Sequence, residues 1–164
     1  MAEGWYVVNV ADADWLTTEG GEKRRSGSEC TFGGEQFGVR IHVLPPGEPN
    51  GLYHSETQQE GFLVLAGECI LLVEGEERRL KRWDFFHSPP GTEHIFVGAG
   101  DSPCAVLMIG SQTGEWTIRY PVSELAARHG AGVERELTSP REAYADWEPS
   151  RRGKPSYWHE LPWA

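Results

Sequence analysis

The chain has 164 residues, a length that suits one domain with a full hydrophobic core. Its 25 acidic and 15 basic residues give a net charge of −10 at pH 7, which argues against nucleic acid or an anionic membrane as a partner, because both need a basic surface. The 20 glycines and 11 prolines are typical of many turns between short strands.

The cysteines and the N-terminus indicate a soluble, cytoplasmic protein of a reducing compartment. The 3 cysteines are odd in number and widely spaced, which disfavours a disulfide framework or a Cys-rich zinc site. Cys69 and Cys104 lie in apolar runs and are interpreted as buried small hydrophobes. We find neither a signal-peptide pattern at the N-terminus nor an apolar run long enough to span a bilayer.

Residues 1–36 are expected to form an N-terminal strand and an irregular arm. Residues 5–10 (Trp-Tyr-Val-Val-Asn-Val) resemble a strand. Residues 11–35 are polar and rich in glycine, and we expect a loop there.

Residues 37–119 show a repeated pattern of strand, turn and strand. Turn signals rich in glycine and proline separate short apolar segments. Many short strands at close spacing favour a sandwich or a barrel. The strands are expected at residues 37–44, 52–56, 60–66, 68–74, 77–80, 84–88, 93–98, 104–110 and 115–119.

Residues 120–164 are expected to form a helical segment and a tail within the same single domain. Apolar residues recur at helical spacing over 122–126, and Gly130 gives a C-terminal stop. A second helix is expected to start at Ser139, which can cap it ahead of a proline at the first helical position. The Trp- and Pro-rich tail from Trp147 is interpreted as an extended arm, packed on the barrel or on a second subunit, or as a partly ordered end.

Two stretches carry metal-capable side chains beside glycine and proline turn residues. The first holds His54, Glu56 and Glu60, and the second runs from Pro89 to His94. Residues two apart in a strand point to the same face, so His54 and Glu56 are expected to project together. Because a strand, a turn and a strand separate the stretches, the second can fold back against the first and bring His94 to His54 and Glu60.

Two imidazoles and one or two carboxylates make a mixed nitrogen and oxygen site. We expect His54, Glu56, Glu60 and His94 to bind one divalent transition metal ion, with zinc favoured over manganese, iron(II) or nickel. With one carboxylate bound, the site keeps open positions for water, oxygen or substrate. With all four residues bound, the site is more closed.

The two stretches resemble the two motifs of the cupin superfamily. The first motif runs Gly, five or six residues, His-x-His, three or four residues, Glu, six residues, Gly; the chain has Gly47, six residues, His54-x-Glu56, three residues, Glu60, six residues and Gly67. The second centres on Pro-x-Gly-x-x-His, which matches residues 89–94.

The resemblance covers residues 37–112 and implies an all-β double-stranded β-helix, a cupin or jelly-roll-like barrel. The sequence after residue 120 adds the short C-terminal helices and the extended tail. It implies that His54, Glu60 and His94 are the metal ligands. The chain departs from the motifs at Glu56, where the family usually has a second His, and at Gly98, where Asn is frequent. Glu56 is therefore a fourth ligand, a catalytic acid or base, or a solvent-facing residue.

Other polar residues are weaker candidates for the same cavity. His42 and His87 lie in expected strands and can point inward, although such histidines more often pack and hydrogen-bond than bind metal. Arg40 and Gln58 can also face the cavity, and an inward Arg40 would favour a carboxylate or phosphate on the ligand.

Three functions remain open at this stage. The first is a metal-dependent enzyme on a small polar molecule, for which the resemblance allows dioxygenase, isomerase, epimerase or decarboxylase chemistry. The second is a non-catalytic module that binds a small molecule, and the third is a metal-free structural barrel. The resemblance also implies a homodimer, because small cupins commonly pair through N-terminal strands and barrel faces.

Overall fold

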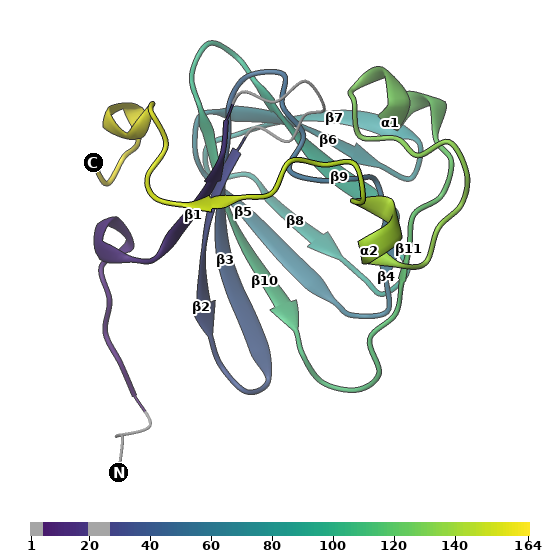
Figure 1. The fold of residues 1–164 in the computed structure, drawn as a ribbon, viewed down its shortest axis with the longest axis horizontal. Helices are drawn as coiled ribbons and strands as arrows, with labels where there is room; N and C mark the ends of the chain where they lie inside the picture. Colours follow the sequence, from purple (N-terminus) through teal and green to yellow (C-terminus); the bar gives the residue numbers. More distant parts are fainter. Residues whose placement is uncertain (1–4, 20–26) are drawn as a thin grey trace.

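Antiparallel β-sheet dominates the computed structural model, which describes residues 5–19 and 27–164 (Figure 1). The strands in these ranges are β1 (Trp15–Thr18), β2 (Gly27–Gly33), β3 (Phe37–Leu44), β4 (Ser55–Glu56), β5 (Glu60–Ala66), β6 (Glu68–Val73), β7 (Glu76–Lys81), β8 (Phe85–Ser88), β9 (His94–Ala99), β10 (Cys104–Ser111), β11 (Ile118–Arg119) and β12 (Arg151–Arg152). The short helices are α1 (Glu124–Arg128) and α2 (Pro140–Ala143), with 3₁₀ turns η1 (Val10–Asp12) and η2 (Trp158–Glu160).

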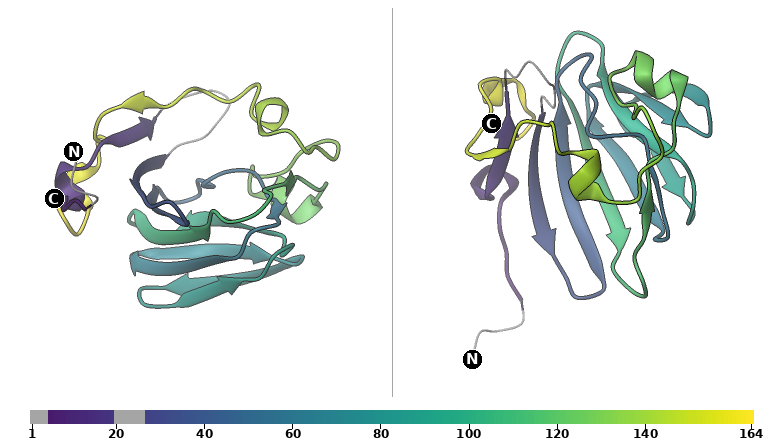
Figure 2. Two further views of the ribbon diagram at one scale, coloured as in Figure 1. Left: turned by 90° about the horizontal axis from the view of Figure 1, so that it is seen from below. Right: turned by 45° about the vertical axis from the view of Figure 1, so that its right-hand side comes forward.

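The strands form layered sheets that make a jelly-roll-like barrel, which confirms the expected all-β fold class. A seven-stranded sheet has the order β12-β1-β2-β3-β10-β5-β8, a three-stranded sheet the order β7-β6-β9, and β11 pairs with β4. Strands distant in sequence lie side by side, since β10 pairs with both β3 and β5. The left view of Figure 2 shows the layers from their edge.

The alternation of side chains along the strands explains where the barrel core forms. On β5, Phe62 and Val64 are buried while their neighbours Leu63 and Leu65 are only partly buried, as expected when successive side chains point to opposite faces. The inward residues pack against Leu71 of the smaller sheet in one apolar cluster. This burial of apolar surface stabilises the two layers against each other.

The expected strands between residues 37 and 111 agree with the structure to within one or two residues at most ends. The strands expected at 37–44 and 60–66 have the bounds of β3 and β5. The strands expected at 52–56 and 115–119 are shorter, because only the two-residue pairs β4 and β11 form a ladder.

The prediction for the N-terminal region is wrong in two respects. Residues 5–9 form no regular element, and the chain enters η1 at Val10 instead of continuing a strand. β1 and β2 lie inside residues 11–35, where a loop was expected. Their buried positions include small or polar side chains such as Ser28, which donates a hydrogen bond to Thr17. The rest of that expected loop, residues 20–26, lies outside the described residues.

The C-terminal tail packs on the same chain. Trp158 and Trp163 contact Trp15 with ring centroids 5.3 and 5.6 Å apart, and β12 pairs with β1. In the right view of Figure 2, the tail crosses in front of the first strands of the large sheet. Across the described ranges, no helix has the length and apolar character needed to cross a membrane.

Candidate metal centre

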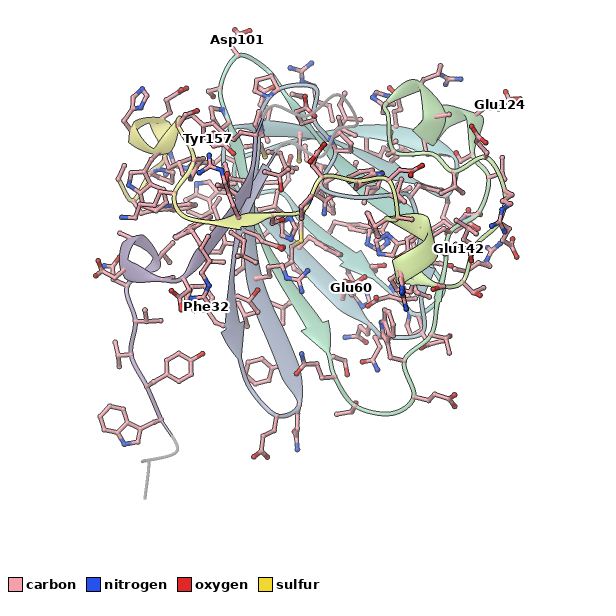
Figure 3. The ribbon with its side chains drawn as sticks, in the orientation of Figure 1. Phe32, Glu60, Asp101, Glu124, Glu142 and Tyr157 are labelled. Carbon is pink, nitrogen blue, oxygen red and sulfur yellow. The ribbon has the colours of Figure 1, made fainter. Side chains whose placement is uncertain are left out.

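His54, Glu60 and His94 come together from an isolated bridge just before β4 and from the first residues of β5 and β9. His54 forms an isolated bridge with His94, in which the two backbones exchange N–H···O hydrogen bonds of 3.2 and 2.8 Å. Glu60 begins β5, inside the barrel outline in Figure 3. One nitrogen or oxygen atom from each of the three side chains lies within 4.8 Å of the others. The second motif therefore folds back against the first, as its position in the sequence predicted.

A tight turn sets the position of His94. Gly91 has a φ of +83°, a conformation that favours glycine, and its N–H donates to the carbonyl of Glu56 at 2.7 Å. This bond ties the Pro-Pro-Gly turn to β4. His94 consequently starts β9 directly opposite His54.

Backbone carbonyls orient both imidazoles. Nδ1 of His54 lies 2.7 Å from the carbonyl oxygen of Leu52, and Nδ1 of His94 lies 3.0 Å from that of Thr92. Because a carbonyl oxygen can only accept, the neutral rings carry their proton on Nδ1 and leave Nε2 with a lone pair. In metal-binding histidines, a hydrogen bond of this kind at the nitrogen that does not bind the metal fixes the tautomer.

Burial keeps the three side chains uncharged when no cation is bound. It lowers the pKa of His54, and burial together with the neighbouring His54 lowers the pKa of His94 to about 4. Burial, followed by the charge of Glu56, raises the pKa of Glu60 to about 8. The group is thus poised to exchange a proton on Glu60 for a cation.

The donor set fits a divalent transition metal ion. Oε2 of Glu60 is buried without a hydrogen-bond partner, 3.4 Å from Nε2 of His94. Once Glu60 has lost its proton, two electron-pair donors face each other, because that nitrogen carries a lone pair when the ring is neutral. A shared cation satisfies both atoms, and two imidazole nitrogens with one carboxylate are a common set for zinc or iron(II).

Glu56 lies at the cavity wall but outside this three-residue group. Its Oε2 accepts a hydrogen bond from the indole Nε1 of Trp116 at 2.9 Å. Glu56 therefore has a protein donor of its own, whereas Oε2 of Glu60 has none.

His54, Glu60 and His94 line a cavity of about 620 Å³. Arg40, His42 and Gln58 line this cavity, as the sequence suggested they can. His87 does not: it is exposed on β8 opposite Gly61, while the next residue, Ser88, is buried. The alternation of strand faces thus places His87 on the outside of the barrel.

The cavity also uses residues that sequence reasoning did not single out. Tyr120 and Tyr144 line it, and the ring of Tyr120 lies 5.9 Å from that of His54. The Tyr144 hydroxyl accepts a hydrogen bond from the Leu52 N–H at 2.9 Å. Both tyrosines follow the barrel segment in the chain, so no local motif connects them to the metal group.

Gly98, the second departure from the motifs, has a steric cause. A Cβ atom at this position would lie 2.1 Å from the carbonyl oxygen of Pro45. The backbone of residues 45–48 runs directly against β9, with the Gly98 N–H donating to the Glu48 carbonyl at 2.9 Å. An asparagine side chain therefore has no space here.

Comparison with known proteins agrees with this architecture. Residues 40–110 match the family model of the cupin domain. An uncharacterised protein of Methanocaldococcus jannaschii is 23% identical over 93 residues, which cover 57% of this chain and 74% of that protein.

Solved structures share the fold at low sequence identity. A cupin-superfamily sugar phosphate isomerase from Silicibacter pomeroyi has a TM-score of 0.63 at 20% identity, covering 84% of this chain and 94% of that one. The polyketide cyclase RemF from Streptomyces resistomycificus has a TM-score of 0.57 at 16% identity, covering 66% and 80%. The match at residues 40–110 identifies a cupin domain in this part of the chain, and the solved structures share its jelly-roll-like fold.

Proposed function

We propose that this cupin binds one divalent transition metal ion through His54, Glu60 and His94 and acts as a metal-dependent enzyme on a small polar molecule. The observation that carries the proposal is the convergence of these three side chains, within 4.8 Å, on a cavity of about 620 Å³. A cavity of this size suits a small molecule.

Three protein ligands leave positions open at such a site, which favours turnover over a closed structural site. Zinc is the favoured ion, with manganese, iron(II) and nickel as alternatives for the same donors. When bound, an ion of this kind supplies Lewis acidity toward a substrate oxygen and lowers the pKa of water.

Proton transfer in the reaction needs a side chain of the protein. We assign Glu56 the role of acid or base, because it lines the cavity and lies outside the metal group. Trp116 donates to Oε2 of Glu56 and so orients the carboxylate, while Oε1 can accept or deliver a proton.

The reaction we favour is an isomerase- or dioxygenase-type conversion. One fold neighbour is described as a sugar phosphate isomerase and another as a polyketide cyclase, which supports an enzyme but not a particular substrate. A non-catalytic module that binds a small molecule is the alternative.

Elemental analysis of purified protein tests the metal assignment. We expect one equivalent of a transition metal in the wild type and its loss in both His94→Ala and Glu60→Ala. His87→Ala is the matched control, because His87 is exposed and lies outside the cavity lining. A wild type that stays metal-free after reloading with zinc, manganese and iron(II) would refute the proposal.

A second step separates the enzyme from the binding module. The metal-loaded protein is assayed for isomerase and dioxygenase turnover beside Glu56→Gln. We expect Glu56→Gln to retain its metal but to lose turnover by about 100-fold to 10,000-fold, the usual contribution of a general acid or base. Ligand binding without turnover in the wild type would favour the non-catalytic alternative.

A further inference from the structure

The cavity has two polar ends: the metal group (His54, Glu60 and His94) and Arg40. Among the cavity-lining residues that the structure describes, Arg40 is the sole lysine or arginine. Its strand β3 pairs with β10, and β10 pairs with β5 (Figure 1). Arg40, Met108 and Phe62 therefore form one row across the sheet. Glu60 lies two residues before Phe62 and therefore faces the same side. Two strand spacings, about 10 Å, separate Arg40 from the strand that carries Glu60.

The guanidinium of Arg40 is only loosely held by the protein. Its Nη1 lies 3.7 Å from Oε2 of Glu29, which is longer than a hydrogen bond. That same oxygen lies 2.8 Å from Nε2 of His42, which is closer to it than Arg40 is. About half of the Arg40 side chain, 51%, is exposed. A planar guanidinium with N–H groups available on one edge binds a carboxylate or phosphate through two parallel hydrogen bonds.

Apolar surface separates Arg40 from the metal group. Met108 lies between Arg40 and Phe62 in the row, and all three line the cavity. The ring of Phe62 lies 4.9 Å from that of Phe96, which extends the same apolar surface. The wall is therefore polar at Glu60, apolar in the middle and cationic at Arg40, which matches a ligand with two polar ends and a short carbon body.

Two of the three acidic residues that line the cavity in the described part of the chain have close partners of their own. Oε2 of Glu29 lies 2.8 Å from Nε2 of His42, and Oε2 of Glu56 accepts a hydrogen bond from Trp116. Glu60 belongs to the proposed metal group, where a divalent ion would more than offset its charge.

We propose that Arg40 binds an anionic group, a carboxylate or a phosphate, of a small substrate whose other end reaches the metal group. This inference rests on the proposed function, since it names the substrate class for the same cavity. Arg40 selects small acids or phosphate esters with a further oxygen function a few bonds away.

Calorimetric titration with matched three-carbon probes tests this assignment. The zinc-loaded protein is titrated with glycerol, glycerate and glycerol 3-phosphate, which differ in carrying no anion, a carboxylate or a phosphate. We expect at least one anionic probe to bind more tightly than glycerol, and which of the two does so identifies the anion.

Variants of the arginine decide whether Arg40 is responsible. Arg40→Gln should weaken anionic-probe binding about tenfold to a hundredfold, as expected for lost hydrogen bonds to a charged group. Arg40→Lys should recover part of the affinity, because it restores the charge but not the planar fork. Arg82→Gln is the control for net charge: Arg82 is exposed over the ring of Trp83 and lies outside the cavity lining.

Two results would overturn the inference. One is that neither anionic probe binds more tightly than glycerol, and the other is that Arg40→Gln binds the anionic probes as well as the wild type does. Metal content is measured on the same samples. A wild type that does not bind metal would refute the proposed function. A wild type that binds metal, but binds the anionic probes no better than Arg40→Gln does, would refute the role of Arg40 alone.

Discussion

The hydroxyl of Tyr144 accepts a hydrogen bond from the backbone N–H of Leu52, at 2.9 Å. Leu52 in turn presents its carbonyl oxygen to Nδ1 of His54, at 2.7 Å. A residue from the C-terminal segment, just after α2, thus fixes the residue that orients one imidazole of the metal group. The packing is close, because a Cβ atom at Gly51 would lie 2.8 Å from the same hydroxyl.

Removal of this hydroxyl should weaken metal binding. Tyr144→Phe keeps the ring that packs on Tyr120 but leaves the Leu52 N–H without its acceptor. We expect the metal affinity to fall about tenfold to a hundredfold, the usual cost of losing a partner behind a ligand. Competition with a zinc chelator measures the affinity. Tyr6→Phe is the control, since its hydroxyl bonds the backbone of Gly33, away from the cavity; an equal loss there would contradict a specific role for Tyr144.

The pKa shifts predict how the stability of the metal-free protein depends on pH. Burial raises the pKa of Glu60 from 4.5 to about 8, so the folded state holds this proton more tightly than the unfolded state. The free energy of unfolding should therefore fall as pH rises from 4.5 toward 8. The pKa of His94, lowered from 6.5 to about 4, acts in the opposite direction between these two values. Above pH 6.5, the effect of Glu60 remains.

Denaturant unfolding of metal-free protein at pH 6.5 and pH 8 measures this dependence. The wild type should be less stable at pH 8, and Glu60→Gln, which cannot ionise, should lose most of the difference. Because metal binding requires the Glu60 carboxylate, the apparent metal affinity of the wild type should rise over the same interval. A wild type that gains stability toward pH 8 without metal would contradict the raised pKa.

The close approach of backbone at Gly98 predicts a large cost for a single methyl group. Gly98→Ala places Cβ 2.1 Å from the Pro45 carbonyl oxygen, so β9 or the segment after β3 has to move. We expect the free energy of unfolding to drop by about 1–3 kcal/mol, as for other overpacked sites. Gly33→Ala is the matched strand control, because a Cβ atom there meets no atom within 4 Å. Thermal unfolding of both variants provides the comparison, and equal midpoints would show that β9 relaxes without cost.

The parts of the fold that could be predicted from sequence are those encoded by local patterns. Strand alternation and Gly- or Pro-containing turns set the positions of β3 to β10 along the chain, and the motif spacing brings His54, Glu60 and His94 together. The sequence did not predict β2, because its buried positions include Ser28 as well as Cys30 and the alternation of apolar residues is therefore weak.

Contacts between distant segments could not be predicted in the same way. Tyr144 reaches Leu52 from 92 positions along the chain, and no sequence pattern connects the two residues. Glu29 meets His42 only because β2 pairs with β3 in one particular register. The face of His87 likewise depends on register, since one position separates the exposed His87 from the buried Ser88.

The tail should contribute to the stability of the barrel, because its side chains complete an apolar cluster. Leu161 is 5% exposed and packs with Trp15 and Ile41 on the outer side of the large sheet. Leu161→Ala removes buried apolar volume, and we expect it to lower the free energy of unfolding by about 2–5 kcal/mol. Val122→Ala is the control, because Val122 is 59% exposed and should cost little. Denaturant unfolding with matched m-values measures both; an unaltered midpoint in Leu161→Ala would mean that the tail is held to the barrel too weakly to stabilise it.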